Sequence, residues 1–129
     1  MGPTIALFGE AEKGDFSSLH QISSVPQLSD HLGNPPEDSL AILLAVQALM
    51  FDHSLVFIRV REEGFSLADY MRGLKLLETQ GTALSIQALC LPGVGNPEII
   101  HASRSLCKLH QSLLIISEQD LYDYLTDIQ

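Results

Sequence analysis

The sequence is poor in basic residues. It holds seven Lys and Arg against sixteen Asp and Glu, which gives a formal net charge of -9 over 129 residues. Nucleic acids and anionic membrane surfaces are bound through clustered Lys and Arg side chains, so neither partner is expected. Long apolar runs are also missing. The longest, residues 40–51, is shorter than the roughly 20 residues that a membrane-spanning helix needs.

Cysteine is scarce as well, with only Cys90 and Cys107 present. Residues 1–8 have neither a basic start nor a small-residue cleavage site, so they are not expected to form a signal peptide. Both thiols are therefore predicted to be free, in the reducing environment of the cytoplasm. Cys90 falls in an apolar strand and Cys107 on an apolar helix face, which predicts inert core positions.

The chain lacks the common motifs of catalytic and metal centres. It contains no P-loop, no GxSxG and no HExxH. Cys107 and His110 form an isolated CxxH, whereas a structural zinc site needs four ligands. The protein is therefore expected to be non-enzymatic, with no metal and no other cofactor.

Apolar segments alternate with amphipathic ones along the chain. Strands are predicted at residues 4–8, 54–61, 83–91 and 112–116, with a short edge strand at 21–24. Strands that alternate with helices form parallel sheets, and strands apolar on both faces need helices on both sides. The sequence therefore predicts one domain over residues 1–129. Its fold class is α/β, a three-layer sandwich of about four parallel strands, of the flavodoxin or Rossmann type.

Helix ends are predicted from capping residues. Gly33 and Gly81 are expected to end the first and third helices. The expected N-terminal caps are Asp38 or Ser39 for the second helix, Ser66 with Asp69 for the third, Asn96 with Pro97 for the fourth, and Ser117 with Asp120 for the fifth. The buried stripe of the last helix is expected to run to Ile128.

Ligands of such sheets usually lie beyond the carboxyl ends of the strands. The residues expected at that crevice are Gly9, Glu10, Glu12, Arg59, Arg61, Gly93, Gly95 and Asn96. Glu10 and Glu12 are either part of a solvated loop or a pair for acid–base chemistry or magnesium. Arg59 and Arg61 are expected to pair with these glutamates in a structural role. The PGVGN segment is either a turn with a helix cap or an anion site.

Residues 40–51 form an unusual helix, apolar on every face. Such a helix must be covered on all sides, whereas one sheet covers a single side. Either residues 21–32 fold over it or another subunit does. In the second case the interface is expected to include Leu40, Leu43, Leu44, Met50 and Phe51. The protein is then a homo-oligomer or a subunit of a larger assembly.

The order of several segments resembles that of phage tail sheath proteins. IALFGEAEKGDF at residues 5–16 is similar to their opening strand and loop, and QISSVPQLSDHLGN to the short helix that follows. AILLAVQALMFDHSLVFIRV is similar to their helix, turn and next strand. The stretch from LADYMRGLKLLE to SLLIIS is similar to their later order of helix, strand, PG turn, helix and strand. The similarity covers residues 5–117.

This resemblance implies an assembly role without catalysis. The chain departs from the family at Asp15, where proline is usual, and at Asp52 and His53, where glycines are usual. It lacks the long insertion after the second main strand, and few residues flank the predicted core, whereas sheath subunits share terminal strands. Small oligomers or attachment to a larger complex are therefore expected rather than long tubes. The alternative is a small nucleotide- or anion-binding domain that uses the strand-end crevice.

Overall fold

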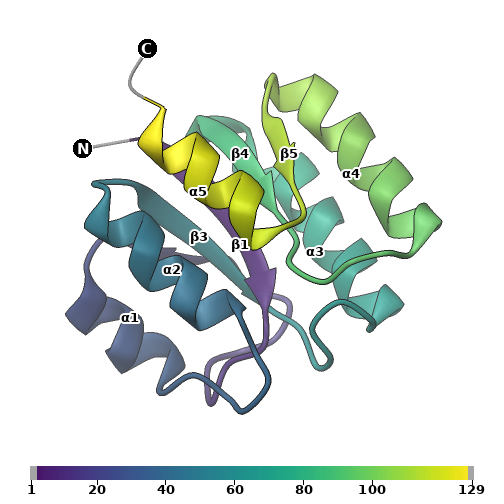
Figure 1. Cartoon of the computed structure of the whole chain (residues 1–129). Coiled ribbons are helices and arrows are strands. Elements are labelled where there is room, and N and C mark those ends of the chain that lie inside the picture. Colours follow the sequence, from purple (N-terminus) through teal and green to yellow (C-terminus); the bar gives the residue numbers. More distant parts are fainter. Residues whose placement is uncertain (1–2, 128–129) are drawn as a thin grey trace.

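A computed structural model describes residues 3–127 as one sheet between two layers of helices (Figure 1). The strands are β1 (Thr4–Gly9), β2 (His20–Ile22), β3 (Ser54–Arg59), β4 (Ile86–Cys90) and β5 (Leu113–Ile115). The helices are α1 (Val25–Leu32), α2 (Ala41–Met50), α3 (Leu67–Gln80), α4 (Pro97–His110) and α5 (Glu118–Thr126), and a 3-10 turn, η1 (Gly81–Leu84), follows α3.

The strand β1 lies at the centre of the sheet because both of its faces are apolar. The strand order is β2-β3-β1-β4-β5, and neighbouring strands are parallel except for β2, which is antiparallel at one edge. Residues 5–9 are all buried, as expected of a strand with neighbours on both sides and helices on both faces. The predicted parallel sheet and its short edge strand are confirmed.

Side chains of the sheet alternate between two cores, one on each face. Ile5 and Leu7 belong to one core with residues of α1, α2 and α5, whereas Ala6 and Phe8 belong to the other with residues of α3 and α4. Figure 1 shows these two groups of helices on opposite faces of the sheet. On the second face, the Tyr70 ring stacks on Phe8 with 5.4 Å between the ring centroids. The three-layer α/β sandwich predicted from the alternating segments is therefore confirmed.

Three helix ends follow their local sequence signals. Gly33 ends α1 with a positive φ of 77°. The Asn96 side chain accepts a hydrogen bond from the Glu98 N–H at 2.8 Å, and α4 begins at the next residue, Pro97. The Ser117 hydroxyl accepts from the N–H three residues on, at 3.1 Å, and caps α5. Each of these caps is made within a few residues, so the sequence pattern suffices to find it.

The predicted start of α2 is wrong. The helix begins at Ala41, and neither Asp38 nor Ser39 caps it. The Ser39 hydroxyl instead donates to the carboxylate of Glu63 at 2.7 Å. Glu63, which is 24 residues from Ser39, therefore binds the N-terminal end of α2 in place of a cap from a neighbouring residue.

The helix α3 lies between Ser66 and Gly81 as predicted, but the contacts and conformation at both ends differ from the prediction. Asp69 makes no capping box with Ser66, because its buried carboxylate accepts hydrogen bonds from the side chains of Arg61, at 2.8 Å, and Arg72, at 3.2 Å. Gly81 has a φ of -86° and leads into η1 rather than adopting a left-handed end. Tertiary contacts therefore override the local signals at this helix.

The apolar helix α2 has the sheet beneath it and one helix on each side, α1 and α5 (Figure 1). The predicted cover at residues 21–32 thus lies beside α2 and leaves its outer side open. In α5, Leu121 and Leu125 are buried as predicted, and Ile128 lies outside the described residues. None of the helices in residues 3–127 combines the length and apolarity needed to cross a membrane.

Candidate functional site

The carboxyl end of β1 is closed by the loop that follows β3. The Glu10 N–H donates a hydrogen bond to a carboxylate oxygen of Glu63 at 3.0 Å. In return, the Glu63 N–H donates to the Glu10 carboxylate at 2.9 Å. This reciprocal pair fastens two loops that are 53 residues apart in the sequence.

The carboxylate of Glu63 also caps α2. It accepts hydrogen bonds from the Leu40 N–H at 2.9 Å and from the Ser39 hydroxyl at 2.7 Å. A negative charge is favourable at this position because the backbone N–H groups at a helix N-terminus carry partial positive charge. In folds of this type an anionic ligand commonly occupies such a position. Here the chain's own carboxylate occupies it.

Close packing leaves no space for a side chain at Gly9, which was expected in the crevice, or at Gly64, which lies against another expected residue, Gly93. A Cβ atom on Gly9 would collide with the side chain of Ala41. Gly93 packs against Gly64, where an added Cβ would lie 2.6 Å from the Gly93 carbonyl oxygen. Gly95 has nothing within 4 Å of such an atom, and the Asn96 side chain is used as the cap of α4. The PGVGN segment is therefore a turn and a cap.

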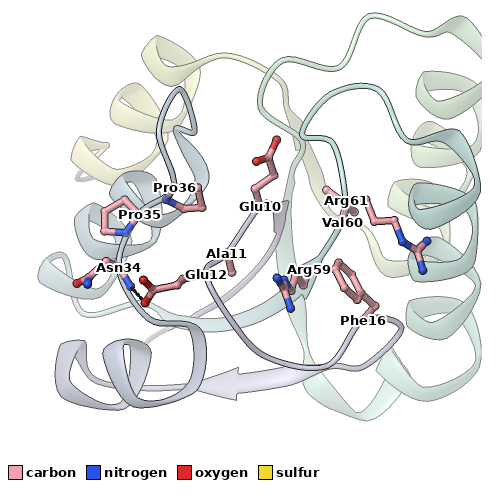
Figure 2. Close-up of a pocket in the computed structure, with 10 residues that line it drawn as sticks. All are labelled: Glu10, Ala11, Glu12, Phe16, Asn34, Pro35, Pro36, Arg59, Val60 and Arg61. Atoms are coloured by element: carbon pink, nitrogen blue, oxygen red, sulfur yellow. Dashed lines mark hydrogen bonds between the residues drawn. The ribbon is translucent and has the colours of Figure 1, made fainter.

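A separate pocket of about 260 Å³ opens beside β1 and β3. Figure 2 shows Glu12 and Asn34 on one side of it and Arg59 and Phe16 on the other. The full lining is Glu10, Ala11, Glu12, Phe16, Asn34, Pro35, Pro36, Arg59, Val60 and Arg61. Four of the eight residues predicted for the crevice thus line the same pocket, namely Glu10, Glu12, Arg59 and Arg61.

The two arginines do not pair with the glutamates, contrary to the prediction. Arg59 donates to the Gly14 carbonyl oxygen at 2.6 Å and lies over the Phe16 ring, 4.2 Å from its centroid. Arg61 binds Asp69 through both its backbone and its side chain, each at 2.8 Å. The arginines therefore tie the loops after β1 and β3 to the sheet and to α3.

The acidic side chains near the pocket are partly engaged in structure. Glu12 accepts a hydrogen bond from the Asn34 N–H at 3.0 Å (Figure 2), and Glu10 accepts from Glu63. The Nε atom of Arg59 is buried and has no hydrogen-bond partner among the described residues. No three His, Cys, Asp or Glu side chains within residues 3–127 are grouped as metal ligands would be. The lining of the pocket thus combines two arginines, Arg59 and Arg61, with two glutamates, Glu10 and Glu12.

The cysteines lie in the core, as predicted, and both thiols are free. Burial, with a smaller contribution from the nearby Glu63 carboxylate, raises the pKa of the Cys90 thiol to about 12. Burial also raises the pKa of the Cys107 thiol. A cysteine nucleophile reacts as the thiolate, which neither environment favours at neutral pH.

Stability is expected to fall as the pH rises above the ordinary thiol pKa of 9.0. The Cys90 and Cys107 thiols and the Tyr70 hydroxyl all have a higher pKa in the folded protein than in the unfolded chain. Deprotonation therefore favours unfolding. Urea midpoints should be constant up to about pH 9 and decline above it. Cys90→Ala should weaken this decline while costing about 1 kcal/mol at neutral pH through lost packing. A midpoint that does not change in alkali would contradict the prediction.

The outer side of α2 exposes a stripe of apolar side chains. Leu40, Leu43, Met50 and Phe51 are 41%, 53%, 75% and 42% exposed, and we call these four the α2 surface. Leu44, the fifth residue predicted for an interface, is only 1% exposed. That part of the prediction is wrong because Leu44 lies on the side of the helix that faces the sheet.

The layer of α1, α2 and α5 carries most of the exposed apolar side chains. Six of the nine large ones exposed in residues 3–127 belong to it: Val25, Leu40, Leu43, Met50, Phe51 and Tyr122. The α2 surface is therefore the main apolar feature of the described molecular surface.

The sequence places Glu63 at the carboxyl end of a strand, but no sequence pattern predicts its contacts, and none singles out Phe16, which lies against Arg59. Their contacts join segments far apart in the chain, for which no spacing rule exists. Comparisons of this chain with protein families, with curated proteins and with solved structures found no match.

Proposed function

We propose that this chain is a non-enzymatic assembly protein that binds another protein through the α2 surface. The observation that carries the proposal is a row of apolar side chains left open along a helix with no charged residue. Contiguous apolar patches on a protein surface commonly mark interaction sites. The partner is either a second copy or a component of a larger complex. The resemblance to tail sheath proteins supports an assembly role of this kind.

The alternative function, nucleotide or anion binding at the strand ends, has weaker support. The amides of Glu10 and Leu40, which an anion at this position would use, already donate to Glu63. The neighbouring pocket presents Arg59 but also Glu12, whose carboxylate opposes an anion. The strand-end residues are better explained as a joint between loops.

Self-association at micromolar concentration is expected, and it should strengthen as salt is added. Salt screens the repulsion between two chains of charge -9 while leaving the apolar contact in place. Sedimentation velocity over a concentration series, at low and high ionic strength, measures this. Leu43→Glu should abolish the association without unfolding the chain, because the Leu43 side chain is 53% exposed.

The matched control is Leu109→Glu, since Leu109 is 60% exposed but belongs to α4 on the other layer. It should leave association unchanged. Equal effects of the two substitutions would show that the α2 surface has no special role. A melting temperature raised by several degrees by a nucleotide, at about 100 times its Kd, would support the alternative function instead.

A further inference from the structure

The basic residues of this protein are unevenly distributed between its two helical layers, whereas acidic residues occur in both. The helices α1, α2 and α5 contain no Lys or Arg. The seven basic residues are Lys13, Arg59, Arg61, Arg72, Lys75, Arg104 and Lys108. They lie in the loop after β1, in or just after β3, and on α3 and α4 of the opposite layer. The three helices of the layer that carries the α2 surface are thus free of Lys and Arg. Lys13 lies at the C-terminal end of α1, where its N–H donates to the Leu32 carbonyl oxygen at 3.2 Å.

Acidic side chains surround the α2 surface on its flanks and at both ends. Asp30 lies on α1, Glu37 and Asp38 precede α2, Asp52 follows it, and Glu118, Asp120 and Asp123 lie on α5. All seven side chains are exposed. Figure 1 shows α2 between α1 and α5, so the elements on both sides of the α2 surface carry exposed acidic residues.

The shape of the α2 surface matches one face of a helix. Leu40, Leu43 and Met50 follow the spacing i, i+3, i+10, which keeps them on one side of α2, and the half-buried Gln47 occupies the i+7 position between them. Ten residues of helix extend about 15 Å. A partner helix of about three turns would cover this length with apolar side chains three and four residues apart.

We infer that the α2 surface docks an amphipathic helix of another protein whose polar positions are basic. This inference rests on the proposed function and names the chemistry of its partner. Apolar side chains of the partner would cover Leu43 and Met50, and its Lys or Arg side chains would reach the acidic residues on both sides. Complementary charges of this kind speed association and select the partner.

A second copy of this chain fits the same surface less well. Stacked α2 helices would bring Asp38 of one copy near Asp38 or Asp52 of the other, in parallel and antiparallel arrangements respectively. The flanking helices α1 and α5 would contribute only further Asp and Glu. Like charges set opposite one another disfavour a pairing, so a basic partner is preferred over self-association.

The test uses two dye-labelled synthetic peptides of about 14 residues. Both carry Leu at every third or fourth position, and the remaining positions are Lys in one peptide and Gln in the other. Fluorescence anisotropy with the full chain should show that the Lys peptide binds at least about tenfold more tightly than the Gln peptide. Its affinity should fall as salt is raised, which is the opposite of the trend expected for self-association.

Variants of the chain locate the binding. Leu43→Ser with Met50→Ser should weaken binding of the Lys peptide at least about tenfold, because both apolar contacts are lost. Asp38→Asn with Asp52→Asn should weaken it about threefold to tenfold and leave the Gln peptide unaffected. Asn tolerates the positive φ of 63° and 62° at these two positions. The matched controls are Leu109→Ser and the pair Glu78→Gln with Glu98→Gln, on the opposite layer.

Each result separates the inference from the function on which it rests. Loss of binding in the α2 variants alone supports the inference. Equal loss in the control variants, or equal binding of both peptides, overturns it. Self-association through Leu43 without peptide binding overturns the inference and keeps the proposed function. If the chain neither self-associates nor binds the Lys peptide, both the inference and the proposed function are overturned.

Discussion

Replacing Gly9 by alanine is expected to destabilise the fold by about 3 kcal/mol or more. The new Cβ atom would collide with the side chain of Ala41 and lie 2.6 Å from a carboxylate oxygen of Glu63. Neither neighbour can move freely, because Ala41 is fully buried at the start of α2 and Glu63 accepts three hydrogen bonds. Urea unfolding followed by circular dichroism measures the loss.

The matched control is Gly95→Ala. An added Cβ there meets nothing within 4 Å, and Gly95 is not among the glycines with positive φ. Its stability should stay within about 0.5 kcal/mol of the original chain, or rise slightly because alanine restricts the unfolded chain. If both variants unfold at the same urea concentration, the carboxyl end of β1 is loosely packed and has room for a ligand.

Replacing Glu63 by alanine is expected to cost about 3 kcal/mol and to lower the melting temperature by about 10 °C. The N–H groups of Glu10 and Leu40 and the hydroxyl of Ser39 would all lose their acceptor. The N-terminus of α2 would also lose the negative charge that its backbone favours. Differential scanning calorimetry at neutral pH measures both quantities.

Glu62→Ala serves as the comparison, because Glu62 is exposed and holds Ser66 through its backbone rather than its carboxylate. It should change stability by less than about 0.5 kcal/mol. Low concentrations of inorganic phosphate should not raise the melting temperature of the original chain. A rise would contradict the proposed role of Glu63, since phosphate would then be displacing the carboxylate from a site meant for a ligand.

Together, these two substitutions test what the strand ends are for. If Gly9 and Glu63 are as important for stability as their contacts indicate, the region is a joint that holds β1, α2 and the loop after β3. The proposed function at the α2 surface does not depend on this joint. Binding assays on α2 variants and unfolding assays on strand-end variants should therefore give separate results.

The candidate site could be predicted only in part. Glu10, Glu12, Arg59 and Arg61 were expected together because the carboxyl ends of parallel neighbouring strands meet at one edge of the sheet. Their actual partners were not foreseeable. Glu63 lies 53 residues from Glu10 and 24 from Ser39, and spacing along the chain does not predict which loops will touch.

The sequence by itself determined the fold class, because the periodicity of apolar residues and the capping of helices are set by residues close together in the chain. A β1 segment that is apolar on both faces indicates a central strand covered by helices on both sides, and Asn96 and Ser117 begin helices with bonds made two or three residues away. Only the tertiary structure decided which side of α2 stays open. The sequence of α2 is apolar all round, so Leu43 and Leu44 are equivalent until the sheet, α1 and α5 have packed against it. Packing buries Leu44 and leaves Leu43 exposed.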